Sequence, residues 1–245
     1  MSMSIEAQDD LNRFVDPPRI GNVLVTGGGS GLGAAIAAAV ASAGGVPVVF
    51  DLAPAPSEDG PVYSVDVSDR RAVEDAVEHA ASRLGRIDAI VTAAGIDRCG
   101  RLDEIPGDEW DRVIAVNLLG TVNLVRAALP HLEAVHGRVV TVASTLALRG
   151  VSDATAYCAS KFGILGFSRA LSAETAGRIG VTTLIPGGMS TSFFDGRTEQ
   201  YKPGPDTHLN DPRDVARAVL FALSQPQGCE VRELLICPDT EGSWP

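Results

Sequence analysis

NVLVTGGGSGLG, residues 22–33, is a short run of apolar and β-branched residues that ends in a glycine-rich loop. The alanine-rich segment AAIAAAVASA follows and ends before Gly44-Gly45, as expected of a helix. Glycines at a strand–helix junction let the backbone approach a pyrophosphate, and the helix N-terminus offers free N–H groups. The spacing Thr26-Gly27-x-x-x-Gly31-x-Gly33 differs from G-x-G-x-x-G, and a plain tight turn is the alternative. The strand–helix context favours a dinucleotide site.

Strands and helices alternate along the rest of the chain. The expected strands are Asn22–Thr26, Val46–Phe50, Val62–Val65, Ile87–Thr92, Arg138–Ala143, Val181–Ile185 and Glu233–Cys237. Besides the alanine-rich helix, the expected helices run from an N-cap at Ser68 to about Leu84, over 108–135, over 152–176, and from Asp211-Pro212 to about Leu223. This alternation predicts βαβ units, and so a Rossmann-like, doubly wound parallel α/β sheet with helices on both faces.

The expected organisation is one domain. Residues 20–245 carry the alternating pattern without a repeat, and the length of 245 residues suits a single α/β domain. Residues 1–19 are expected to form an N-terminal arm ahead of it. Residues 189–210 are polar and lack helical periodicity, with turn-forming residues that disfavour a continuous helix. We expect this segment to be a substrate lid.

Bulk properties argue against several kinds of partner. The formal net charge of −11 disfavours binding to nucleic acid or to an anionic membrane. The cysteines lack C-x-x-C spacing and are expected to be reduced thiols. The N-terminus has no apolar region typical of a signal peptide, and no apolar run looks long enough to span a bilayer. These features predict a cytoplasmic protein.

Two acidic residues follow strands near the glycine-rich loop. Asp51 ends the second strand, where a carboxylate accepts hydrogen bonds from an adenosine ribose and repels a 2′-phosphate. The alternative is an ordinary loop carboxylate. Asp66-Val67 ends the third strand, where the Asp66 carboxylate either reaches an adenine amino group or only caps the next helix. Because no arginine neighbours Asp51 in the sequence, NAD(H) is predicted over NADP(H).

Tyr157 and Lys161 are four positions apart, in AYCASK (residues 156–161), and therefore share one face of a helix. A free phenol, with a pKa near ~10, is a poor base at neutral pH, and a neighbouring ammonium favours the phenolate. The pair is thus a candidate for proton transfer. The same spacing also occurs on exposed helix faces, so the pair needs support from other motifs.

Taken in order and at their spacing, the motifs resemble the single-domain branch of the short-chain dehydrogenase/reductase family. The resemblance extends from about residue 20 to the end of the chain. It rests on Thr26-Gly27-Gly28-Gly29-Ser30-Gly31-Leu32-Gly33, Ala93-Ala94-Gly95, Asn117, Ser144, Tyr157-x-x-x-Lys161 and Pro186-Gly187.

This resemblance implies the roles of the site residues. Ser144 would hydrogen-bond the substrate oxygen, and Asn117 would distort its helix and hold a water near the lysine. Tyr157 would transfer the proton, and Lys161 would also bind the nicotinamide ribose. The implied cofactor-binding residues are Gly27, Ser30, Gly31, Leu32, Gly33, Asp51, Asp66, Val67, Ala93, Gly95, Tyr157, Lys161, Pro186, Gly187 and Thr191. Pro186-Gly187 and Thr191 resemble the segment that covers the nicotinamide carboxamide.

The sequence departs from the family pattern in three places. Thr92 and Ala93 replace two asparagines that commonly precede Ala94-Gly95. The C-terminus lacks the common Asp-Gly-Gly ending, and the N-terminal arm is longer than the motifs require. The family implies a homo-oligomer, with a tetramer favoured. We expect Trp244, a costly residue to expose at a chain end, to pack on a neighbouring subunit.

The predicted function is NAD(H)-dependent interconversion of a secondary alcohol and a ketone, without a metal. The predicted substrate contacts are Ser144, Tyr157, Asp97, Arg149 and Gly188. The predicted walls of the substrate site are Ile96, Asp97, Arg98, Thr145, Leu146, Arg149, Gly188, Met189, Phe193 and Phe194. This mixture of charged and aromatic residues suggests a polar, ring-containing sugar, nucleoside or secondary-metabolite ketone, or a hydroxy acid held by Arg98 or Arg149.

Three alternatives remain open at the level of sequence. A dinucleotide-sensing binding protein would keep the fold and lose the chemistry, which the intact catalytic set disfavours. An NADP(H)-dependent ketoreductase would share the catalytic set and differ at Asp51. A dehydratase or epimerase would need a larger substrate domain than 245 residues leave room for.

Overall fold

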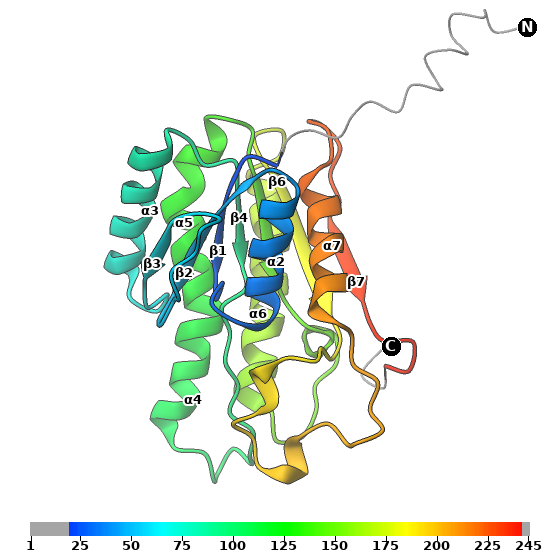
Figure 1. Ribbon diagram of the computed structural model, residues 1–245. Helices are drawn as coiled ribbons and strands as arrows, with labels where there is room; N and C mark the ends of the chain where they lie inside the picture. Colours follow the sequence, from blue (N-terminus) through cyan, green and yellow to red (C-terminus); the bar gives the residue numbers. More distant parts are fainter. Residues whose placement is uncertain (1–19, 242–245) are drawn as a thin grey trace, which may run out of the picture.

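The computed structural model describes residues 20–241, and within them the strands form one parallel sheet in the order β3-β2-β1-β4-β5-β6-β7 (Figure 1). The strands are β1 (Asn22–Thr26), β2 (Val46–Asp51), β3 (Val62–Ser64), β4 (Ala89–Thr92), β5 (Arg138–Val142), β6 (Gly180–Pro186) and β7 (Glu233–Ile236). Because β1 pairs with both β2 and β4, the strand order reverses there. The predicted doubly wound α/β fold is confirmed, with its ligand crevice expected at the carboxyl ends of these strands.

Two helical layers cover the sheet. Helices α2 (Gly31–Ser42) and α7 (Pro212–Leu223) pack on one face, and α3 (Arg70–Leu84), α5 (Gly120–Glu133) and α6 (Thr155–Glu174) pack on the other (Figure 1). Side chains alternate along each strand, so consecutive residues of β1 enter different cores. Val23 and Val25 lie in the core under α2 and α7, and Leu24 lies in the opposite core.

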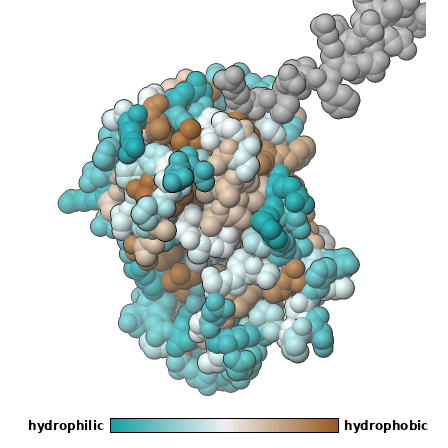
Figure 2. Space-filling model, viewed as in Figure 1, coloured by the Kyte–Doolittle hydropathy of each residue, from teal (hydrophilic) through white to brown (hydrophobic). Residues whose placement is uncertain are grey.

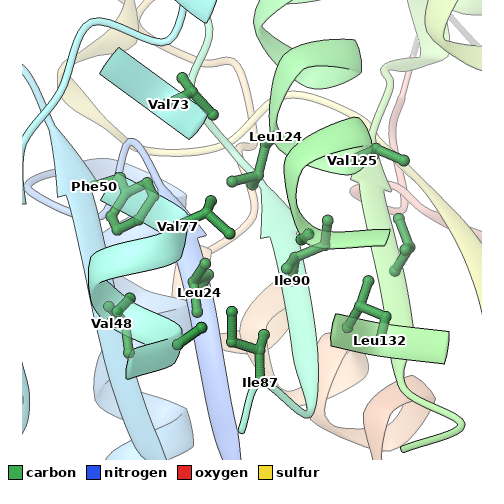
Figure 3. Close-up of a cluster of buried hydrophobic side chains, with 14 of the residues drawn as sticks. Leu24, Val48, Phe50, Val73, Val77, Ile87, Ile90, Leu124, Val125 and Leu132 are labelled. Atoms are coloured by element: carbon green, nitrogen blue, oxygen red, sulfur yellow. The ribbon is translucent and has the colours of Figure 1, made fainter. Parts of the chain in front are cut away.

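The core under α3 and α5 is the larger cluster of buried side chains. Figure 3 shows Val77 of α3 and Leu124 of α5 pointing toward the strands that carry Leu24 and Ile90. Phe50, at the end of β2, is fully buried in the same cluster. This packing fixes the carboxyl ends of β1, β2 and β4 relative to one another, and those ends carry the candidate site.

The N-cap of α3 differs from the prediction. Asp69, not Ser68, caps the helix, and its carboxylate accepts hydrogen bonds from Arg71 N and Ala72 N. Ser68 instead donates its hydroxyl and its backbone N–H to Asp66 Oδ1, at 2.6 and 2.9 Å. An aspartate that accepts from the residue two positions later forms a turn of its own, and the helix begins after that turn.

The long helix expected over 108–135 is interrupted. It consists of α4 (Gly107–Ile114), a π-helical turn η1 (Ala115–Leu119) and α5. Contrary to the expectation from sequence, Gly107–Glu133 is long and apolar enough by composition to cross a membrane. Leu124, Val125 and Leu132 pack into the core of the sheet, as in the core helix of a globular domain.

The segment between β6 and α7 forms no continuous helix, as predicted. It contains two short 3-10 helices, η3 (Ser192–Phe194) and η4 (Glu199–Tyr201), and Met189 pairs with Asn210 across its ends. Figure 1 shows it, in yellow to orange, below the sheet. On the face seen in Figure 2, strongly hydrophobic residues form separate spots and the lower part is mostly hydrophilic. The predicted arm 1–19 and Trp244 lie outside the described residues.

Candidate active site

A cavity of about 570 Å³ lies at the carboxyl ends of the strands, where the strand order reverses. Every residue predicted to bind the cofactor lines it, and so do Ser144 and Gly188. Of the other predicted wall residues, the following also line it: Ile96, Thr145, Leu146, Met189, Phe193 and Phe194. The fold therefore brings the glycine-rich loop, Tyr157 and the lid segment to one space.

Two glycines are required for the loop to pack in this way. Gly27 has φ +67°, and a Cβ on it would stand 2.8 Å from Ala94 Cα. A Cβ on Gly33, in the first turn of α2, would stand 2.1 Å from Gly27 O. No acidic residue occupies the first turn of α2. Its N-terminal N–H groups thus face the cavity edge with a favourable dipole for a pyrophosphate.

The Asp51 carboxylate is held at the end of β2 by the neighbouring backbone. Its Oδ2 accepts from Gly29 N at 3.0 Å and its Oδ1 accepts from Ala53 N at 3.1 Å. These bonds place the carboxylate in the cavity lining, beside the glycine-rich loop. Remaining lone pairs on both oxygens suit the hydroxyl groups of a ribose.

Asp66 is paired in a way that sequence reasoning missed. Arg112 Nη2 donates to Asp66 Oδ2 at 3.0 Å, and Ser68 donates to Oδ1. Partial burial alone would raise the pKa of Asp66, but the hydrogen bonds from Ser68 and Arg112 outweigh it and lower that pKa. Arg112 lies 46 positions away in the sequence and also lines the cavity, so a cation is present in this half of the site.

Tyr157, on the first turn of α6, is hydrogen-bonded to Ser144 at the end of β5. The Ser144 hydroxyl oxygen also accepts from Leu146 N at 3.1 Å, which orients it. Burial raises the pKa of Tyr157 well above its ordinary value, and the bond with Ser144 offsets only part of this. This direction opposes the expected shift toward the phenolate, and proton transfer by Tyr157 stays a prediction.

Lys161 lies one turn further along α6 and is almost fully buried. Its Nζ donates to Val142 O at 2.9 Å and stands 5.5 Å from the centroid of the Tyr157 ring. Burial, opposed in part by the charge of Asp97, lowers the pKa of Lys161 to about 8. A lysine with this pKa can exchange a proton near neutral pH, next to the phenol.

Asn117 lies in the π-helical turn and is fully buried. Its Oδ1 accepts from Ile96 N at 2.8 Å, and its Nδ2 donates to Ile96 O at 2.9 Å and to Ser160 Oγ at 3.1 Å. The widened turn lets the side chain hold the loop after β4 against α6. The helix distortion implied by the family resemblance is present, and the predicted bound water stays a prediction.

Three charged residues predicted for the substrate site do not line the cavity. Asp97 is 4% exposed and paired with Arg197 at 2.6 Å. Arg98 is exposed and paired with Glu109, and Arg149 is exposed outside the lining. Sequence spacing placed these residues near the catalytic set, but Asp97 and Arg98 form ion pairs, and none of the three residues lines the cavity.

Arg197 and Glu241 are among the lining residues that were not expected from the sequence. Arg197, in the lid segment, lies with its guanidinium carbon 5.1 Å from the Phe193 ring centroid. Glu241, near the C-terminus, accepts from Gly188 N at 3.0 Å. Gly188 and Glu241 are 53 positions apart in the chain, so no local signal could have identified Glu241. For Arg197, the aromatic residues Phe193 and Phe194 just before it in the chain were a weak signal.

Comparisons with known proteins identify the family of the chain. The family model described as short chain dehydrogenase matches residues 21–202. D-threitol dehydrogenase of Mycolicibacterium smegmatis is 35% identical over 220 residues, covering 82% of this chain and 85% of that protein. An uncharacterised oxidoreductase of Staphylococcus aureus is 32% identical over 226 residues, covering 88% of this chain and 96% of that protein.

Solved structures share the fold. The ligand-free aldohexose dehydrogenase of Thermoplasma acidophilum superposes with a TM-score of 0.81 at 23% identity, over 89% of this chain and 92% of that one. An alcohol dehydrogenase from Thermococcus sibiricus, complexed with 5-hydroxy-NADP, superposes with a TM-score of 0.78 at 26% identity. That comparison covers 88% of this chain and 95% of the other.

Proposed function

The chain belongs to the short-chain dehydrogenase family of nicotinamide-dependent oxidoreductases acting on alcohols, and we propose that it interconverts a secondary alcohol and a ketone with NAD(H). The observation that carries the proposal is the hydrogen-bonded Tyr157–Ser144 pair beside Lys161, in the same cavity as the glycine-rich loop. We also propose that the substrate is a small molecule and that the protein is a cytoplasmic homo-oligomer.

The residues present fit a dinucleotide. Two positions of the loop exclude a Cβ, the first turn of α2 offers N–H donors and carries no acidic residue, and Asp51 would meet the adenosine ribose. When bound, the nicotinamide supplies or accepts a hydride. Pro186 and Gly187 would cover that ring from the end of β6, and Lys161 would hold its ribose.

The chain's own groups handle the proton and the developing charge. In the reductive direction Tyr157 Oη donates a proton to the carbonyl oxygen, while Ser144 Oγ hydrogen-bonds the same oxygen and polarises it. Lys161 restores the proton to Tyr157, because the lowered pKa of its ammonium makes it a better proton donor near neutral pH. The same groups act in reverse during alcohol oxidation.

The cavity supports a neutral, polar substrate. Asp97 and Arg197 compensate each other, and Arg98 and Arg149 stand outside the lining, so support for a hydroxy acid held by either arginine is lost. The relative named D-threitol dehydrogenase acts, by its name, on a small polyol. We therefore propose a sugar or polyol, and rank the nucleoside and secondary-metabolite ketones below it.

Coenzyme choice is the least constrained part of the proposal. Asp51 favours NAD(H), but Arg112 brings a cation into the adenosine half, and one structural neighbour is complexed with an NADP analogue. Arg112 is bonded to Asp66 and Ser68, which reduces its capacity for a phosphate. Because Arg112 is already engaged, we propose NAD(H) as the coenzyme, and an NADP(H)-dependent ketoreductase is the second candidate.

An absorbance screen at the reduced-nicotinamide band tests the proposal. NAD and NADP are each offered with polyols, aldoses, simple secondary alcohols and hydroxy acids, and NADH and NADPH with the matching ketones. We expect turnover of a neutral polyol or sugar with NAD, absent in Tyr157→Phe. Dinucleotide binding without turnover on any panel would instead favour the dinucleotide-sensing alternative.

A further inference from the structure

A buried ion pair at the rim of the cavity has no part in the proposed proton transfer. Arg197 Nη2 donates to Asp97 Oδ2 at 2.6 Å, and the two side chains are 18% and 4% exposed. Arg197 belongs to the lid segment and Asp97 to the loop after β4, 100 positions away. The pair therefore joins two elements that meet only in the folded protein.

Asp97 is bound on both oxygens. Its Oδ1 accepts from Arg98 N at 2.7 Å, and Cys99 Sγ donates to Oδ2 at 3.2 Å. Burial, together with the charge of Asp97, raises the pKa of Cys99 to about 12, so Cys99 is a neutral donor. Arg197 is the group that neutralises the Asp97 carboxylate.

Arg197 is held on its other sides by the lid itself. Its guanidinium carbon lies 5.1 and 4.7 Å from the ring centroids of Phe193 and Phe194, and Nη1 donates to Tyr201 O at 3.2 Å. The Phe193 ring lies 5.8 Å from the Tyr157 ring. A packed row thus extends from the ion pair, through Phe193, to the proton donor.

The position of Arg197 is costly. Its Nε is buried and has no hydrogen-bond partner among the described residues. An unpaired buried N–H destabilises the fold, and an arginine turned to solvent would avoid this loss. A second tie supports the same arrangement, because Tyr201 Oη donates to Asp153 Oδ2 at 3.2 Å.

We propose that the Asp97–Arg197 pair is a latch that holds the segment Ser192–Tyr201 over the cavity, and that Arg197 is a positioning residue for Tyr157. The latch stands on the contacts alone. The positioning role rests on the proposed function, because it concerns proton transfer by Tyr157. Arg197 acts through Phe193 and through its charge, and it leaves the reacting oxygen to Tyr157 and Ser144.

The charges around Tyr157 give this role a distinctive signature. The groups that face the phenol are Ser144 from the loop after β5, Lys161 and Cys158 from α6, Asp97, and Arg197. The charge of Asp97 raises the pKa of Tyr157 and the charge of Arg197 lowers it. With the pair intact the two effects oppose each other, and removal of either member leaves the other uncompensated.

Hydrogen exchange of the cofactor-free protein tests the latch. Arg197→Met and Asp97→Asn should each speed exchange of the amides of 192–201 by at least about tenfold, because each leaves a buried charge unpaired. Lys202→Met is the matched control, since Lys202 pairs with the exposed Glu199 at 2.5 Å outside the cavity lining. Unchanged exchange in either latch variant, or equal acceleration in the control, would overturn the latch.

The pH dependence of alcohol oxidation with NAD tests the positioning role, with an alcohol that the wild type oxidises. Arg197→Met should move the rise in kcat to higher pH, Asp97→Asn should move it to lower pH, and the double variant should return close to wild type. If both single variants shifted the rise in kcat in the same direction, or not at all, positioning by charge would be refuted. A merely structural defect would not move the two pH profiles in opposite directions. If the wild type oxidises no alcohol, the proposed function has failed, and hydrogen exchange still decides the latch.

Discussion

At the residue scale, Tyr157 is predicted to be the acid and base. Tyr157→Phe keeps the ring and removes the hydroxyl, so turnover should fall by about 10²- to 10⁴-fold, the usual contribution of a proton-transfer group. NADH affinity, measured by fluorescence titration, should stay within about twofold, because a hydroxyl bond is a small part of cofactor binding. Tyr63→Phe is the control, since Tyr63 Oη is buried without a hydrogen-bond partner among the described residues and outside the cavity. Near wild-type turnover in Tyr157→Phe would contradict the assignment.

Lys161 is predicted to make stability depend on pH. Its folded-state pKa of about 8 is below the ordinary 10.5, so between these values the folded protein binds fewer protons than the unfolded chain and stability rises with pH. In the cofactor-free protein, the free energy of unfolding of the wild type should therefore rise by up to about 3 kcal/mol, relative to that of Lys161→Met, between pH 7 and 10.5. Denaturant unfolding across this range measures it. A constant difference would mean that Lys161 titrates normally.

Asp51 is predicted to set the coenzyme preference. Two unit charges ~4 Å apart interact by about 4 kcal/mol at an effective dielectric of 20, and screening reduces this to roughly a ten- to hundred-fold preference for NAD(H). Asp51→Ala should narrow the ratio of kcat/KM for the two coenzymes, and Leu52→Arg should begin to reverse it. Asp59→Ala, in the same exposed loop but outside the cavity, should leave the ratio unchanged. A wild type that prefers NADP(H) would implicate Arg112 instead.

At the scale of the element, two helical glycines are predicted to respond in opposite ways. Gly33→Ala places a Cβ against the Gly27 carbonyl in the first turn of α2, and such overpacking costs about 1–3 kcal/mol. Gly166→Ala on α6 meets open space and should stabilise by up to about 1 kcal/mol, through helix propensity. Denaturant unfolding of both variants measures the two changes in the free energy of unfolding. Equal effects would show that the loop relaxes around Gly33.

At the scale of the whole molecule, a homotetramer is predicted. Phe162 on α6 and Phe221 on α7 are 46% and 55% exposed, and contacts between subunits would cover such side chains. Light scattering at micromolar concentration should give a mass near four times 25.5 kDa. A monomeric mass would contradict the prediction. The proposed contribution of Trp244 is tested by removing 242–245 and repeating the measurement.

The sequence by itself determined the order of the elements and the parallel doubly wound sheet, and it predicted residues that line the cavity. These follow from signals that act over a few positions: alternation along strands, glycines that exclude a Cβ, and Tyr157 one helical turn from Lys161. Family spacing then placed Ser144 correctly beside Tyr157. Such signals are local because backbone geometry is local.

Only the tertiary structure decided which charged and polar groups meet at the site. Arg112 meets Asp66 across 46 positions, Glu241 meets Gly188 across 53, and Arg197 meets Asp97 across 100. The same packing buries Lys161 and partly buries Tyr157, and this burial moves their pKa values apart, whereas the sequence led us to expect a shift toward the phenolate. Desolvation and ion pairing depend on which segments meet in space, and a parallel sheet brings together strand ends that are far apart in the chain.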